Sequence, residues 1–177
     1  MIGLAMHLRL LVIHGLMLSG LFGLVAVVSL LADPMIWLDN YPPNIRAAIG
    51  DSVEPPVVAK TITAIALVVA VIGGLVLSVR RLDRESGGVG FRGVVLHVFL
   101  LFWFVNAFDV VVLDWLLFMN VLRPWVILPG TEGMAGYDDY LFHLRGSFAT
   151  LAPWIGSLIL SVGFGAGWWS LVARRRS

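Results

Sequence analysis

The chain has 177 residues, of which 59% are hydrophobic and 13% are charged, and its formal net charge is +1. A soluble domain carries roughly a quarter charged residues, so this composition excludes an ordinary soluble protein and predicts a membrane protein. The absence of cysteine excludes disulfide frameworks, thiolate metal sites and CxxC redox chemistry. The net charge by itself says nothing about nucleic acid, and we expect no nucleic-acid partner.

Four apolar runs are each long enough to cross a hydrocarbon layer of ~30 Å, which takes about 20 helical residues. They predict transmembrane helices over residues 10–32, 57–79, 93–122 and 147–173. The first run exceeds the ~7–15 apolar residues of a signal peptide, so we expect it to remain in the mature protein. We predict an all-α membrane protein, a single polytopic domain folded as an antiparallel four-helix bundle.

Basic and acidic residues separate to opposite ends of this predicted bundle. The basic end holds Arg9, Arg80, Arg81, Arg84, Arg92 and Arg174 to Arg176. The acidic end holds Asp33, Asp39, Asp51, Glu54, Glu132, Asp138 and Asp139 in two longer segments, together with Arg46, Lys60, Arg123 and Arg145. The positive-inside rule therefore places both termini in the cytoplasm and the two longer segments outside, as in a bacterial-type cytoplasmic (inner) membrane.

Small residues recur every four positions on the first and the fourth predicted helix. They are Gly15, Ser19 and Gly23 on the first helix, and Ser157, Ser161 and Gly165 on the fourth. Small residues at this spacing let two backbones approach closely, and in lipid such packing drives helix association. We expect these two helices to pack on each other. The alternative is that the same faces join copies of the chain in a homo-oligomer or attach it to a larger membrane complex.

Two histidines are expected at similar depths near the cytoplasmic side. His14 lies five residues after Arg9 on the first helix, and His97 lies five residues after Arg92 on the third. Facing each other across the bundle, they could hold a metal ion or serve as axial ligands of a haem. We favour the simpler interpretation, in which each imidazole bonds a neighbouring hydroxyl or carbonyl, because two lone histidines are a weak metal pattern.

Each of the two outer segments predicts a short helix. In the first, the stretch DNYPPNIRAAIGD would form a helix with Asp39 or Asn40 capping its start and Gly50 its end. The second predicts an extended piece, a glycine-rich turn and a short helix capped by Asp138 or Asp139. Irregular polar loops held on rigid elements are where functional sites tend to lie.

The stretch FWFVNAFDVVVLDWLLF places two aspartates, Asp109 and Asp114, in the most apolar part of the third helix. An ionised carboxylate near the bilayer centre costs at least ~2.5 kcal/mol, so both are expected to face the bundle interior or water. With α-helical geometry, Asn106 and Asp109 share one face, whereas Asp114 lies about 140° around from Asp109. The two acids would then not need to touch.

These aspartates have two interpretations. In the first they hold the bundle together through polar partners, for which the candidates are Asn106, Arg123, Lys60, Thr61 and Thr63. In the second, Asn106, Asp109 and Asp114 belong to a site for a cation, a proton or a polar solute that opens outward. The outer loop would cover this site with Arg123, Glu132, Asp138, Asp139, His143 and Arg145.

His143 raises a further alternative for the outer loop. If the stretch DDYLFHL is helical, Asp139 and His143 share a face because they are four residues apart. Together with Glu132 they could bind a divalent metal ion, or act as an acid–base pair. An ordinary surface ion pair has the same spacing.

Three functions remain open on the sequence alone. The first is binding or transport of a cation, a proton or a polar small solute at the acidic site, which we prefer because intramembrane acids are functional-site candidates. The second is a membrane oxidoreductase or metalloenzyme with a metal or haem held by the histidines. The third is a non-catalytic subunit of a larger membrane complex.

Overall fold

The computed structural model describes residues 4–50 and 56–176, with only the backbone at 4–6 and 173–176, and within them it is all-helical without strands. Asp51, Glu54 and the side chains of Arg174 to Arg176, which entered the charge sorting, lie outside this description. Four helices are long and apolar enough to cross a membrane: His7–Ala32, Val57–Ser86, Phe91–Val121 and Leu151–Val172. The chain is therefore a multi-pass membrane protein.

The four spans begin and end close to where the sequence predicts. They comprise α1 (Leu4–Ala32), α3 (Val57–Ser86), α4 (Phe91–Phe108) with its continuation η2 (Asp109–Val121), and α7 (Leu151–Arg176). Helix α3 is longer than expected because its arginine-rich end stays helical until Gly87, whose φ of 68° closes it with an N–H bonded to the carbonyls of Arg84 and Asp83. Helix α7 starts later because Thr150 is extended and separates it from a short π-helical turn, η4 (Arg145–Ala149).

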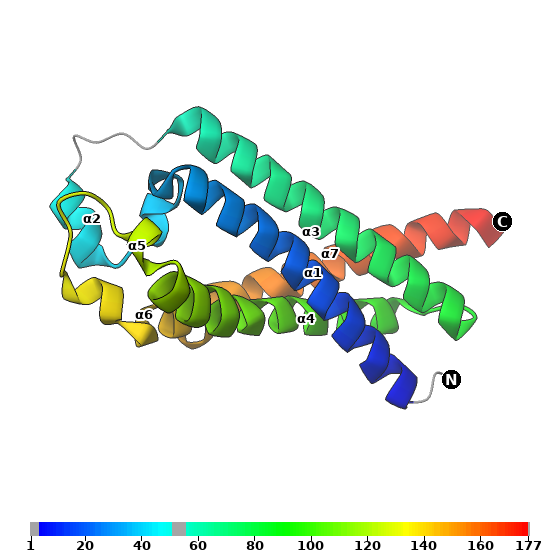
Figure 1. Cartoon of the computed structure of the whole chain (residues 1–177). Helices are drawn as coiled ribbons and strands as arrows, with labels where there is room; N and C mark the ends of the chain where they lie inside the picture. The colour runs from blue at the N-terminus through cyan, green and yellow to red at the C-terminus, as the bar shows by residue number, and fades with distance from the viewer. Residues whose placement is uncertain (1–3, 51–55, 177) are drawn as a thin grey trace.

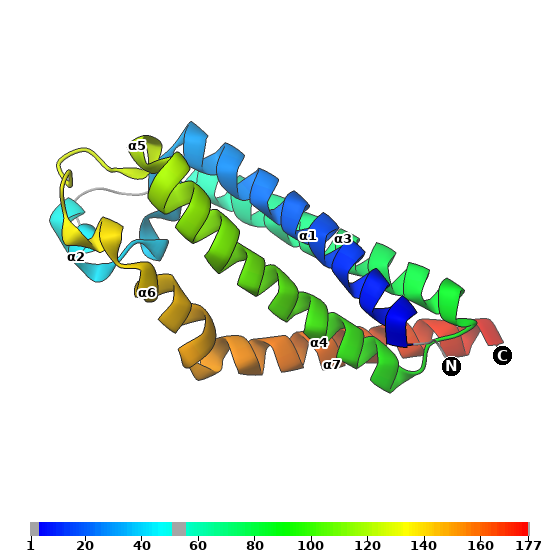
Figure 2. The same cartoon turned by 60° about the horizontal axis from the view of Figure 1, so that its bottom comes forward.

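The third span occupies the middle of the bundle. Helix α1 packs against α3 and α4, whereas α7 packs chiefly against α4. Figure 2 shows α4 between α7 on one side and the pair α1 and α3 on the other. In the inner half, the core of α1, α3 and α4 consists of Leu18, Leu75, Val79, Val94, Val98 and Leu101. The outer faces of the spans expose aliphatic side chains, which fits contact with lipid.

The expected packing of the first span on the fourth is not what the structure shows. A Cβ added at Gly15 would meet the ring of Phe104 on α4, and one added at Gly165 would meet Val95 on the same helix. Both small-residue faces therefore pack on the third span, from different sides. Because Ser19, Ser157 and Ser161 are fully buried within the chain, these faces are not free surfaces for another copy.

A compact cap of short elements closes one end of the bundle. Figure 1 shows α2, α5 and α6 gathered at this end, whereas α1 starts and α7 ends at the other. The cap contains η1 (Pro34–Asn40), α2 (Pro43–Ile49), α5 (Arg123–Val126), η3 (Ala135–Asp138) and α6 (Tyr140–Leu144). Its own core consists of Leu38, Tyr41, Ile45, Leu128 and Tyr137.

The caps of the short helices agree only in part with expectation. Helix α2 ends at Gly50 with a φ of 74°, as predicted, but no side chain caps its start, which follows Pro42. Neither Asp39 nor Asn40 caps it, because both belong to the preceding 3-10 helix η1, whose start is capped by Asp33. Helix α6 is capped by Asp139, whose carboxylate accepts the N–H of Leu141 at 3.1 Å.

Candidate functional site

The half of the third span that is next to the cap is π-helical, which changes which residues share a face. In a π-helix the backbone bonds connect residues five apart and each turn holds more residues than an α-helical turn, so residues i and i+5 lie much nearer one face than in an α-helix. At the end of this segment, for example, the N–H of Leu122 bonds the carbonyl of Leu117 at 2.6 Å. The α-helical separation of about 140° between Asp109 and Asp114 is therefore wrong. The two carboxylates lie on the same face of η2.

Both aspartates line a pocket of about 160 Å³ between the outer ends of the spans and the cap. From η2, Asp109, Asp114, Phe118 and Met119 contribute to its wall, at spacings of four and five residues that fit a π-helical segment. The rest of the wall comes from α1, η1, α5 and the loop that leads into α6. Asp114 is 7% exposed, so its carboxyl group is buried at the pocket wall.

Most of the side chains that the sequence offers as polar partners of Asp109 and Asp114 instead bond to other groups of the protein. Lys60 pairs with Asp39 at the surface, and Arg123 pairs with Asp138 at 2.6 Å. The amide of Asn106 donates to the carbonyl of Ser147 at 3.3 Å, and Thr61 donates to a carbonyl of its own helix. Within the part of the chain that the structure describes, the side chains of Asp109 and Asp114 form no hydrogen bond with another protein group.

A titratable side chain from the cap, that of His143, lies beside Asp114. Nδ1 of His143 lies 3.5 Å from Oδ2 of Asp114, a distance at which an ion pair forms only if the imidazole is protonated. Burial of the imidazole lowers the pKa of His143, and the nearby charge of Asp139 opposes this effect. At neutral pH the imidazole is therefore mostly neutral, and it contributes no positive charge beside Asp114.

Contacts with η2 hold the outer loop over the pocket. The indole N–H of Trp115 donates to the carbonyl of Tyr140 at 2.8 Å, and the amide of Asn120 donates to the Tyr140 hydroxyl at 3.2 Å. The ion pair between Arg123 and Asp138 ties the same loop to the end of η2, and it holds the pKa of Asp138 below its ordinary value. These contacts set α6 against η2 and bring His143 to Asp114.

The structure brings together some of the loop residues that the sequence proposed, but not all. Arg123, Asp139 and His143 line the pocket with the two aspartates. Glu132, Asp138 and Arg145 are exposed and lie outside its lining. Glu132 instead accepts the N–H of Gly130 at 3.1 Å, within its own turn.

No group of three or more histidine and acidic side chains among the described residues is arranged to hold a metal ion. Glu132 does not join Asp139 and His143 at the pocket, and Asp139 is engaged in capping α6. A divalent metal at these three residues stays a prediction that nothing in the geometry favours.

Sequence reasoning missed the aromatic part of the pocket. Five aromatic side chains line it: Phe22, Trp37, Tyr41, Phe118 and Tyr137. In the sequence, none of these five residues carries a local pattern that distinguishes it from a core or interfacial aromatic residue. Their shared position depends on how the cap folds over α1 and η2.

A second cavity of about 200 Å³ lies deeper, between α1, α3, α4 and α7. Aliphatic and aromatic side chains form most of its wall, and its polar lining residues are Asn106 and Asp109. Asp109 therefore borders both cavities, between the outer pocket and the membrane interior.

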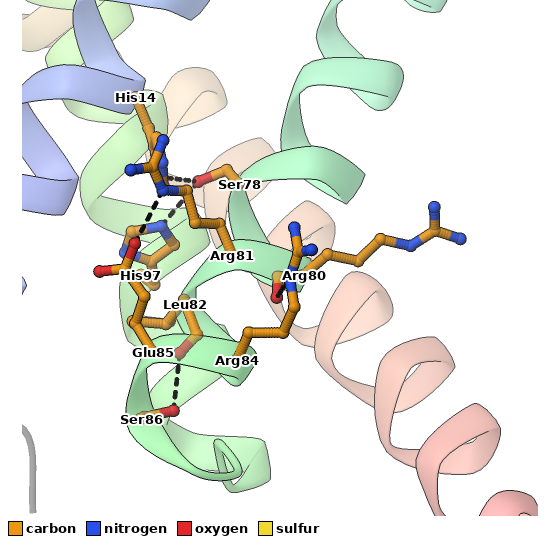
Figure 3. Close-up of polar contacts among 9 residues, drawn as sticks. All are labelled: His14, Ser78, Arg80, Arg81, Leu82, Arg84, Glu85, Ser86 and His97. Carbon is orange, nitrogen blue, oxygen red and sulfur yellow. Dashed lines mark hydrogen bonds and ion pairs between the residues drawn. The ribbon is translucent and has the colours of Figure 1, made fainter.

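The two inner histidines meet at one hydroxyl group. Nδ1 of His14 and Nε2 of His97 each lie 2.8 Å from Oγ of Ser78, as the two dashed lines in Figure 3 show. All three residues are buried, and they come from α1, α4 and α3. The serine hydroxyl occupies the position between the ring nitrogens, where a shared metal or haem iron would lie. This is the hydrogen-bonded arrangement of the simpler interpretation, and haem or metal binding stays an untested prediction.

Comparisons with protein-family models, curated proteins and solved structures give no match. The function is therefore inferred from the geometry of the pocket.

Proposed function

We propose that this small integral membrane protein binds a small positively charged species in the outer pocket and passes it into or across the membrane. The observation that supports this most is the charge of the pocket wall. Asp109, Asp114 and Asp139 line the pocket, whereas its one lining arginine, Arg123, is already paired with Asp138 outside the lining. With a neutral His143, the described lining holds three carboxyl groups and no unpaired basic side chain, so a cation or a proton can serve as their partner.

The burial of the carboxylates supports the same proposal. An ionised acid at membrane depth is costly unless a cation or hydrogen-bond donors accompany it. The basic side chains that could have served as internal partners bond elsewhere, so the described residues hold the aspartates in a pocket and not in a structural ion pair. The proton is the smallest species that could occupy the same position.

The second cavity favours transport over binding alone. Asp109 borders both cavities, so a cation that leaves Asp114 toward the membrane interior meets a second carboxylate before the apolar cavity. We place the pocket on the extracytoplasmic side, because the arginines of α3 and α4 cluster at the opposite end of the bundle.

Calorimetric titration of the purified full-length protein in lipid nanodiscs tests the proposal. The probes are tetramethylammonium, Na⁺ and Mg²⁺, each titrated against the unaltered protein and against Asp109→Asn, Asp114→Asn and Glu132→Gln. At least one probe should bind, and the two pocket variants should bind it at least ~10-fold more weakly, because removing one buried charge partner costs about 2 kcal/mol or more. Glu132→Gln, which lies outside the pocket, should bind normally. Absence of binding by every probe, or equal binding by all variants, would contradict the proposal.

A further inference from the structure

Three aromatic residues that line the outer pocket have the polar tips of their side chains hydrogen-bonded within the protein. The hydroxyl of Tyr41 donates to the carbonyl of Val126 at 2.7 Å. The hydroxyl of Tyr137 accepts the N–H of Leu128 at 2.9 Å and bonds Thr131 at 2.7 Å. The indole N–H of Trp37 donates to Oγ of Ser29 at 3.0 Å. Each polar tip is therefore occupied within the protein.

The two tyrosine rings form a corner of the pocket. Their planes meet at 86° with ring centroids 6.1 Å apart, and both rings are buried among cap residues. Burial raises the pKa of Tyr41 far above its ordinary value, so this phenol stays neutral and cannot act as an anionic ligand. Phe22 and Phe118 add rings without any polar atom. The pocket thus combines aromatic walls with two carboxylates on one side.

This combination fits an organic cation better than an inorganic one. The face of an aromatic ring attracts a cation, and cages of such rings bind quaternary ammonium groups. A bare Mg²⁺ or Ca²⁺ ion needs about six to eight oxygen ligands, whereas the aromatic oxygens here are occupied and Asp139 caps α6. The pocket is also smaller than the ~300 Å³ at which drug-sized sites begin, so a small ligand is required.

We propose that the ligand of the outer pocket is a small organic ammonium, such as a quaternary or protonated amine, held between aromatic rings with its charge near Asp109 and Asp114. This inference rests on the proposed function and specifies the chemical class of its ligand. The apolar substituents of the ammonium would contact the rings of Tyr41, Tyr137 and Phe118.

The test compares ligands on the unaltered protein, so it does not depend on a variant that must fold. Choline and tetramethylammonium are titrated beside 3,3-dimethyl-1-butanol, which has the shape of choline but no charge, and beside Na⁺ and Mg²⁺. The organic cations should bind at least ~10-fold more tightly than the neutral analogue and than either metal ion. Comparable affinity for the neutral analogue would show that the charge is not recognised, and it would overturn the inference.

An aromatic variant adds a second measurement. Phe118→Leu removes a ring without removing a hydrogen bond, and it should weaken tetramethylammonium binding about fivefold. Phe148→Leu is the matched control, because Phe148 packs on Trp103 and does not line the pocket. Equal affinity of both variants for tetramethylammonium would show that the ring of Phe118 does not contribute to binding.

The results distinguish a failure of the proposed ligand class from a failure of the proposed cation binding. If Na⁺ or Mg²⁺ binds through Asp109 and Asp114 while the organic cations do not, the proposed function stands and the ligand class is wrong. If no cation binds, both fail.

Discussion

Asp109 and Asp114 lie on one face of the third span although five residues separate them, because η2 is π-helical. In an α-helix they would diverge by about 140°, and only one could line a pocket on that side. The π-helical segment therefore creates the paired-carboxylate wall, and the cap brings His143 against one of the pair.

Binding of a cation to the pocket should weaken at acidic pH. Burial lowers the pKa of His143 below its ordinary value of 6.5, so the imidazole is mostly neutral in the folded protein near neutral pH. As the pH falls below 6.5 and through the lowered pKa, protonation places a positive charge 3.5 Å from Asp114, where it competes with the ligand. Titrations of tetramethylammonium across this pH range should show the loss, and His143→Asn should reduce the pH dependence.

Protonation of His143 should also lower the stability of the folded protein at acidic pH. Because the folded-state pKa of His143 is lowered, its contribution to stability is complete above 6.5 and is lost as the pH falls toward the lowered folded-state pKa. Thermal unfolding at a series of pH values should show a smaller acid destabilisation in His143→Asn than in the unaltered protein. Identical profiles would show that another group controls the acid response.

Replacing Ser78 by alanine should destabilise the inner half of the bundle. The change leaves Nδ1 of His14 and Nε2 of His97 buried without a partner, which costs about 1–3 kcal/mol. Ser170→Ala is the matched control, since Ser170 is exposed and bonds only a carbonyl of its own helix, so its effect should stay within about 0.5 kcal/mol. Chemical or thermal unfolding in detergent measures both, and equal stabilities would show that the Ser78 bonds contribute nothing.

Because α1 packs closely on α4, a side chain should not fit at Gly15, whereas one should fit at Gly20 on the same helix. A Cβ at Gly15 would lie 2.5 Å from Cδ1 of Phe104, whereas a Cβ at Gly20 would meet nothing within 4 Å. We expect Gly15→Ala to lower the free energy of unfolding by about 1–3 kcal/mol through overpacking. Gly20→Ala should be neutral within about 0.5 kcal/mol. A neutral Gly15→Ala would show that the two helices do not approach this closely.

The four spans and most of their limits could be predicted because they depend on local composition. Twenty or more apolar residues must form a helix in lipid, whatever they contact. The helix ends at Gly50 and the cap at Asp139 also follow from residue type. Which helices pack on one another could not be predicted from the sequence. Gly15 and Gly165 indicate a close approach of two helices, but they do not indicate which helix approaches.

The candidate site could be predicted only in part. The cost of a carboxylate in lipid directed attention to Asp109 and Asp114, and both line the pocket. Their shared face could not be predicted, since the segment DVVVLDWLLFMNV contains no glycine or proline and nothing in its residue types marks a π-helix. The role of Ser78 between the two histidines, and the position of Tyr41 and Tyr137 at the pocket, depend on tertiary contacts between distant segments.

The most direct test of the central claim is a cysteine scan along the third span. The natural chain has no cysteine, so each variant carries a single thiol, and its modification by a small charged thiol reagent added from outside reports access to the pocket. A π-helical pocket wall predicts reaction at positions 109, 114 and 119, with protection at Leu113, which is 2% exposed and packs toward Gly23. Reaction at 109 and 113 with protection at 114, the pattern of an α-helix, would contradict the account.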